Sequence, residues 1–308
     1  MINSQLEISL KPGLFRTALF TLFVFSSTNS MAGDGQNWIL IDDFDGEKLS
    51  TAWILKDTRN DTDPHIETPQ VTELQNENSN QFLIKKAAPD GVTGNRKALT
   101  FRKLPEPVAL GDVYTFYAKV NVEHFPNNHV FGLSDMTPED IALNDYNALE
   151  PSIRITDKSE SDGTKNDGTM MVRKGETYSK IYNAQQQRPA TPMQAGQWYE
   201  VWMVVNNVPL QQGGQTYDVY IRGGDEFPLQ QLVFQGADFR MKREQALIYF
   251  LANCNTGPSD HPYGNGGLRY DDLYMVKGTV LTTPGHFASA TNSLSYAEQS
   301  QAWLGKSH

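Results

Sequence analysis

Basic and tyrosine side chains are concentrated between residues 152 and 188. This segment carries seven lysines and arginines against five acidic residues, whereas the whole chain has a formal net charge of −10. A polymer of uronic acids needs such a local positive potential, because an acidic protein otherwise repels it. Cleavage of that polymer by β-elimination requires a cation that neutralises the carboxylate, a base for the C5 proton and an acid for the leaving oxygen.

Several side chains in or near this segment could supply these three functions. Arg154 or Lys180 could neutralise the carboxylate, and Tyr182 or Tyr178 could transfer the proton. His129 is an alternative base. The opposing interpretation is an ordinary solvated strand face with aromatic neighbours. We assign catalysis to Tyr182, Lys180, Arg154 and His129, and substrate binding to Tyr178 and Arg173.

A second candidate surface lies on the stretch 196–207, which alternates as a β-strand. One face of this strand suits a core, since it carries Tyr199, Val201, Met203 and Val205. The opposite face is predicted to bind sugar through Trp202, Glu200 and Asn206, because flat aromatic rings stack on sugar C–H faces and polar groups bond the hydroxyls. Trp198, on that same polar face, is expected to pack in the core or under a loop instead.

The two surfaces form one cleft if residues 152–156, 178–182 and 198–206 belong to the same concave sheet. In each stretch the candidate residues stand opposite apolar neighbours, which is the alternation expected of half-buried strands. The cleft would then contain Arg154, Lys180, Tyr182, Glu200 and Trp202.

Paired aspartates near the two ends of the chain are candidate metal ligands. Asp43 follows Asp42, and Asp272 follows Asp271. If the first and last strands are neighbours, these carboxylates converge, and a calcium ion could offset their repulsion. Carboxylates that accept hydrogen bonds from turn amides are the alternative. We expect structural calcium at Asp43 and Asp272, no organic cofactor, and no zinc site.

The surrounding elements are predicted to be short strands. About fourteen candidate strands are separated by Gly, Pro, Asn and Asp, with one short helix after Thr137-Pro138 and a polar loop at 57–67. This pattern indicates an all-β fold, a β-sandwich jelly roll of two antiparallel sheets with a concave groove. One domain is expected over residues 33–278, followed by a tail at 279–308 that is either frayed or carries one short helix at 294–304.

The start of the sequence and the overall charge indicate the compartment. Residues 1–32 resemble a secretory signal peptide, with Lys11 and Arg16 before an apolar run and Ser30-Met31-Ala32 as the cleavage site. The protein is therefore expected to be secreted or periplasmic, without membrane insertion. The acidic net charge argues against nucleic acid as a partner. Cys254 is the only cysteine and is expected to be packed in the core, and a monomer is expected.

Three stretches together resemble the concanavalin A-like lectin/glucanase superfamily: Asp42-Asp43-Phe44, Gly196-Gln197-Trp198-Tyr199 and Leu268-Arg269-Tyr270-Asp271-Asp272-Leu273-Tyr274-Met275. The resemblance covers residues 37–278 and implies that the first and last strands are neighbours, and that the protein acts on or binds polysaccharide. Retaining glucanases of this superfamily share a Glu-x-Asp-x-x-Glu strand, which is absent here. The sequence also lacks the Arg-Ser-Glu and Gln-Ile-His strands of its best-known alginate lyases.

Two functions from different classes remain. The first is a polysaccharide lyase that cleaves an anionic, uronate-containing glycan by β-elimination. The second is a non-catalytic glycan-binding or envelope protein. A single domain with no accompanying catalytic domain favours the enzyme, because a binding module needs something to target.

Overall fold

A computed structural model describes residues 37–160 and 162–285. The predicted signal peptide at 1–32 and the expected helix at 294–304 lie outside these residues. Among the described residues, no helix has the length and apolar character needed to cross a bilayer.

The described chain forms seventeen strands, one α-helix and two short 3-10 helices. The strands are β1 (Ile39–Asp42), β2 (Trp53–Asp63), β3 (Val71–Glu77), β4 (Asn80–Lys86), β5 (Thr93–Val108), β6 (Val113–Val122), β7 (Asn128–Ser134), β8 (Leu149–Thr156), β9 (Met170–Lys174), β10 (Thr177–Lys180), β11 (Tyr182–Asn183), β12 (Arg188–Pro189), β13 (Trp198–Asn206), β14 (Thr216–Gly223), β15 (Phe227–Asp238), β16 (Leu247–Cys254) and β17 (Leu268–Lys277). The helices are α1 (Pro138–Asn144), η1 (Asp145–Ala148) and η2 (Leu210–Gln212).

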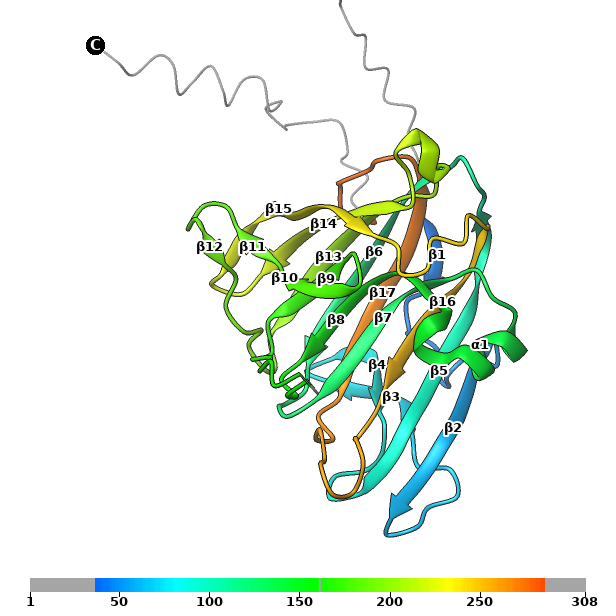
Figure 1. Cartoon of the computed structure of the whole chain (residues 1–308), viewed down its shortest axis with the longest axis vertical. Coiled ribbons are helices and arrows are strands. Elements are labelled where there is room, and N and C mark those ends of the chain that lie inside the picture. The colour runs from blue at the N-terminus through cyan, green and yellow to red at the C-terminus, as the bar shows by residue number, and fades with distance from the viewer. Residues whose placement is uncertain (1–36, 161, 286–308) are drawn as a thin grey trace, which may run out of the picture. The chain divides into compact units, whose positions relative to one another are not determined.

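Two large antiparallel sheets contain most of these strands (Figure 1). The eight-stranded sheet has the order β15-β14-β13-β6-β17-β4-β3, with β1 also paired to β17. The seven-stranded sheet has the order β10-β9-β8-β7-β16-β5-β2. The predicted sandwich of two antiparallel sheets is therefore confirmed, and the first and last strands are neighbours as expected.

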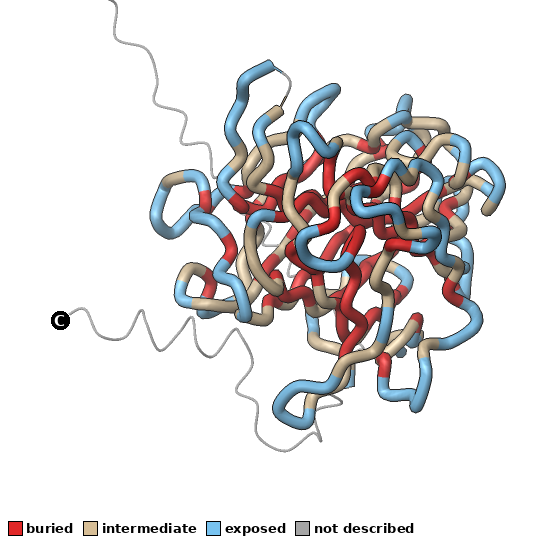
Figure 2. Tube along the Cα trace, turned by 90° about the horizontal axis from the view of Figure 1, so that it is seen from below, coloured by how far each residue is buried: buried red, intermediate tan, exposed pale blue. Residues whose placement is uncertain are grey.

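The main core lies between the two sheets and follows from the alternation of the strands. Val201, Met203 and Val205 of β13 are buried in it, together with Ile153 and Ile155 of β8 from the other sheet. Figure 2 shows buried segments running through the middle of the domain, with exposed loops at its rim. Burial of these apolar faces is the dominant stabilising contribution to the fold.

The predicted loop at 57–67 is wrong in its first part, because β2 extends to Asp63. Within the described part of the chain this strand lies at the edge of its sheet and pairs with β5 alone. Polar side chains are tolerated there, since an edge strand has one side open to water and charged residues discourage further pairing. Its alternation is therefore too weak to be recognised in the sequence.

The short helix α1 covers part of the outer face of the seven-stranded sheet. Thr137 caps it, with its side-chain oxygen accepting a hydrogen bond from Asp140 N at 3.3 Å, and Pro138 begins the helix as predicted. Ile141 packs onto Phe101 and Leu251 in a small second core. The rest of that outer face, over β8 and β9, is not covered by this helix and carries the site described next.

Candidate functional site

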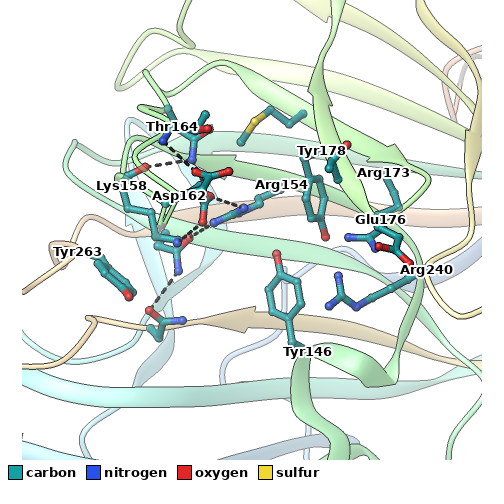
Figure 3. A pocket seen from close by; sticks show the side chains of 16 residues that line it. Tyr146, Arg154, Lys158, Asp162, Thr164, Arg173, Glu176, Tyr178, Arg240 and Tyr263 are labelled. Atoms are coloured by element: carbon teal, nitrogen blue, oxygen red, sulfur yellow. Dashed lines mark hydrogen bonds and ion pairs between the residues drawn. The ribbon is translucent and has the colours of Figure 1, made fainter.

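A pocket of about 550 Å³ opens on the outer face of the seven-stranded sheet (Figure 3). Its base is formed by strands β7, β8, β9 and β10. Its walls come from η1, from the loop residues 157–160 and 162–169, from the segment after β15 and from the loop after β16. The pocket therefore combines rigid strand positions with side chains from four connecting segments.

Strand register places three of the predicted residues on the same face. Ile153 and Ile155 point into the main core, so Arg154 between them points outward. Arg173 pairs directly with Tyr178 across β9 and β10, and directly opposed residues share a face of an antiparallel sheet. Arg154, Arg173 and Tyr178 consequently all line the pocket.

Tyr178 lies between two guanidinium groups. The Cζ atoms of Arg154 and Arg173 are 5.3 and 5.5 Å from the centre of its ring, and Figure 3 shows the two arginines on either side of it. Arg154 is 8% exposed and forms an ion pair with Glu160 at 2.7 Å. Arg173 is 7% exposed and has no carboxylate within ion-pairing distance among the described residues. Arg173 therefore offers a positive charge that is not held in an ion pair within the described residues.

Tyr146 of η1 faces Tyr178 across the pocket, with the hydroxyl ends directed toward each other (Figure 3). Its ring is partly exposed, whereas its hydroxyl oxygen is buried. Burial raises the pKa of Tyr146 well above its usual value of 10.0; Tyr178 raises it further, and Arg154 opposes the rise. The Tyr146 hydroxyl is therefore protonated at neutral pH.

Arg240 covers the ring of Tyr146, with its Cζ atom 4.7 Å from the ring centre. Its guanidinium donates hydrogen bonds to Asn147 Oδ1 at 3.0 and 3.2 Å. Like Arg173, it forms no ion pair among the described residues. Two guanidinium groups that form no ion pair within the described residues thus flank the pair of tyrosine hydroxyls.

Glu150, at the beginning of β8, holds the segment that carries Arg240. Its side chain accepts hydrogen bonds from the backbone N–H groups of Met241, Lys242 and Arg243 at 2.8, 2.9 and 3.0 Å. The Arg243 side chain in turn donates to the carbonyl oxygen of Asn147 at 2.8 Å, which connects the same segment to η1. Tyr146 and Arg240 are therefore positioned by one network.

The opposite wall of the pocket is formed by the loop residues 157–160 and 162–169 and by Tyr263. Lys158 Nζ lies 4.9 Å from the centre of the Tyr263 ring and 2.5 Å from Glu160 Oε2. Asn166 Nδ2 donates to Glu160 Oε1 at 2.8 Å. Glu160 is thus bound to three partners, including Arg154, and fixes this wall of the pocket.

Two residues predicted to act in catalysis lie outside the pocket. The ammonium group of Lys180 pairs with Asp167 at 2.5 Å and does not line the pocket. Tyr182 is 46% exposed and belongs to the separate two-stranded sheet of β11 and β12, beside β15. Neither residue lies among Arg154, Arg173 and Tyr178, which we call the Arg154–Tyr178 cluster, so neither belongs to the proposed site.

His129 points to the inner face of the seven-stranded sheet and is 3% exposed. Its Nε2 atom lies 2.9 Å from the carbonyl oxygen of Gly266. Burial lowers the pKa of His129 from 6.5 to about 3, and the bond to Gly266 opposes this change. The imidazole is therefore uncharged at neutral pH. It cannot reach a ligand in the pocket, because it lies on the opposite face of the sheet.

The expected cleft that includes β13 is not formed, because β13 belongs to the eight-stranded sheet and β8 to the other. Trp202 is 1% exposed, and its indole N–H donates to the carbonyl oxygen of Thr282 at 3.1 Å. Glu200 is held by Arg222 and by the Tyr117 hydroxyl. The prediction of an exposed Trp202 is therefore wrong; the segment after β17 crosses this face and covers it.

Asn206, the third residue predicted on that face, is at the end of β13 and contacts the carbonyl oxygen of Gly213 at 3.4 Å. Its place on the eight-stranded sheet separates it from the Arg154–Tyr178 cluster. The sugar-binding face predicted for β13 is thus the outer face of the other sheet.

The carboxylates expected to bind calcium have other partners. Asp272 pairs with Lys119 at 2.5 Å, and Asp43 accepts a hydrogen bond from the backbone of Asp45 at 3.3 Å. Across the described ranges, no group of three or more His, Cys, Asp or Glu side chains is arranged to hold a metal ion. These residues therefore do not fit a ready-made calcium site.

The pocket residues that were not identified from the sequence include Tyr146, Arg240 and Tyr263. Each of these three lies in a connecting segment, where no periodicity indicates which way a side chain points. The only signal for Tyr146 is its place just after a capped helix, which fixes the direction in which the chain leaves α1.

No protein-family model matches the chain, and no curated protein matches it in sequence. Solved structures are similar at low identity. For the marine PL-14 alginate lyase from Aplysia kurodai the TM-score is 0.44 at 13% identity, covering 67% of this chain and 87% of that one. For the exoplasmic/lumenal domain of VIP36 in its Ca2+/Man-bound form the TM-score is 0.41 at 11% identity, covering 75% and 85%.

Basic winged bean lectin with Tn-antigen has a TM-score of 0.42 at 9% identity, covering 79% of this chain and 99% of that one. Lectins and an alginate lyase are thus among the solved structures to which the chain is similar. With TM-scores of 0.41 to 0.44, these likenesses do not distinguish binding from cleavage.

Proposed function

We propose that this protein binds an anionic, uronate-containing polysaccharide in the Arg154–Tyr178 pocket and cleaves it by β-elimination. The observation that carries the proposal is the convergence of two tyrosine hydroxyls with guanidinium groups that form no ion pair within the described residues. Binding alone requires the positive charge, but it does not require two facing hydroxyl groups. Proton transfer does.

Each of the three requirements of β-elimination is met by a named group. Arg173 and Arg240 neutralise the uronate carboxylate, which acidifies the neighbouring C5 proton. Tyr178, whose ring lies between Arg154 and Arg173, acts as the base that removes that proton. The C4–O bond then breaks, a C4=C5 double bond forms, and the leaving oxygen takes the proton of Tyr146.

The facing hydroxyls also allow the site to be restored. After one turnover Tyr178 carries the substrate proton and Tyr146 lacks its own. A proton passed from Tyr178 to Tyr146 returns both groups to their starting states. No redox partner or further reactant is needed.

Calcium is not part of this mechanism, because Asp43 and Asp272 are engaged elsewhere. The proposal includes export of the chain to a secreted or periplasmic location, supported by the sequence of residues 1–32. It also includes a monomeric state.

The decisive experiment incubates the protein with a panel of uronic-acid polysaccharides and follows the ultraviolet absorbance of new unsaturated ends. Tyr178→Phe is expected to abolish the absorbance rise while leaving binding nearly intact, because only a transferable proton is lost. Tyr182→Phe is the matched control and should retain full activity, since this tyrosine lies outside the pocket.

Two results would change the conclusion. Binding of a uronate polymer with no absorbance rise would identify the protein as a non-catalytic glycan-binding module, the alternative function. Equal activity of wild type and Tyr178→Phe would show that the chemistry, if present, occurs elsewhere.

A further inference from the structure

A second pocket, of about 840 Å³, adjoins the first. The two pockets share Lys158, Glu160 and Tyr263 as a common wall. A polymer bound in the first pocket can therefore continue past this wall into the second. The chemistry of the second pocket then restricts which sugar unit follows the acidic one.

The second pocket offers no unneutralised cation. Its arginine and lysine side chains already face carboxylates: Arg96 lies 3.8 Å from Asp61, and Lys158 lies 2.5 Å from Glu160. Its histidine, His261, also lies beside a carboxylate, with Nδ1 3.2 Å from Asp260. This differs from the first pocket, where Arg173 is free of such a partner among the described residues. A carboxylate on the ligand would have to compete for cations that are already paired.

Two further carboxylates make the second pocket unfavourable for an anion. Asp157 and Asp260 both line it, and Asp260 is largely exposed, with a side-chain exposure of 76%. Like charges that approach each other disfavour binding. Neutral surface is plentiful, because Pro126, Pro258 and Pro262 also line this pocket and present apolar ring faces to a sugar.

We infer that the natural ligand carries an uncharged or esterified sugar next to the acidic one, and that the second pocket selects for it. This inference rests on the proposed function for the first pocket and deepens it. The substrate class is then a heteroglycan or a partly esterified uronan, with the acidic unit in the arginine pocket and the neutral unit beyond Lys158.

The test uses tetramers of galacturonate, mannuronate and glucuronate, each prepared in two forms. In the first form all four carboxylates are free, and in the second only one is free and the other three are methyl esters. Binding is measured by calorimetry in the Tyr178→Phe background. Asp260→Lys is expected to strengthen binding of the fully acidic tetramer about two- to fivefold, the range of exposed charge pairs, and to leave the single-carboxylate tetramer unchanged. A fully acidic tetramer can place any of its carboxylates in the first pocket, which raises its apparent affinity. Comparing each variant with its parent for the same tetramer removes this statistical advantage.

Glu176→Lys is the matched control, because it makes the same charge change at the exposed rim of the first pocket. It should strengthen both tetramers. If Asp260→Lys changes both tetramers equally, or neither, the inference about the second pocket is overturned. Glu176→Lys and Arg173→Gln both change the charge of the first pocket. If neither variant alters the affinity for either tetramer, or if no tetramer binds to the protein, the proposed function itself fails.

Discussion

Glu150→Gln tests whether one buried carboxylate holds the arginine side of the pocket in place. The Glu150 side chain is 1% exposed and accepts three backbone N–H groups at 2.8 to 3.0 Å. Arg243 Nε also lies 3.2 Å from it. The glutamine side chain has almost the same shape, but one of its two oxygens becomes an NH₂ group that faces these donors.

The expected loss follows from the bonds that glutamine cannot make. A hydrogen bond to a charged group contributes about 1.5–3 kcal/mol, and a buried donor left without a partner costs about 1–3 kcal/mol. We expect a loss of about 3 kcal/mol in the free energy of unfolding. For a domain of this size, that corresponds to a decrease in Tm of about 6–12 °C.

The assay is urea denaturation together with thermal melting, followed by glycan binding well below the melting temperature. Glu139→Gln is the control, since this exposed glutamate in α1 should change stability by less than about 0.5 kcal/mol. Weaker glycan binding by Glu150→Gln in its folded state would show that the carboxylate positions Arg240. Identical melts for Glu150→Gln and wild type would refute the reasoning.

Three other predictions concern charges and packing outside the pocket. Burial raises the pKa of Asp271 from 3.8 to about 6, so its protonated form stabilises the fold at low pH. This contribution is lost as the pH rises from 3.8 to about 6. The Tm of Asp271→Asn should therefore increase relative to that of wild type across this pH range, and the difference should stay constant at higher pH. Trp202→Ala should cost about 3–5 kcal/mol in unfolding free energy without changing glycan affinity, since the indole is buried on the other sheet. Melts with calcium and with a chelator should coincide, because Lys119 already neutralises Asp272; a rise in Tm with calcium would instead support the metal site expected at Asp43.

The fold was predictable because alternation is a local property of the chain. The predicted strand at 198–206 is β13, and its apolar residues Tyr199, Val201 and Met203 are buried in the main core. A strand with one apolar face must bury that face, whatever its neighbours are. The short helix after Pro138 was predictable for the same reason, since a cap is also a local signal.

The candidate site was only partly predictable, because the alternation of apolar and polar residues along a strand does not indicate which sheet the strand joins. A sandwich has two outer faces, and the polar faces of β8 and β13 look equivalent in sequence. The structure places Arg154 on one outer face and Trp202 on the other, where the segment after β17 covers the indole. The remaining pocket residues, such as Tyr146 and Arg240, depend on contacts between segments that are distant in the chain.

The position of β17 determines the order in which the chain can become folded. This last strand lies between β6 and β4 in the eight-stranded sheet, so the sheet remains in two parts until Leu268–Lys277 has been synthesised. Partners separated by so much sequence meet slowly, because a long loop has to close first. A growing chain that lacks β17 therefore leaves the hydrogen-bonding edges of β6 and β4 open. Such a chain cannot complete its eight-stranded sheet, and its open edges can pair with strands of other chains.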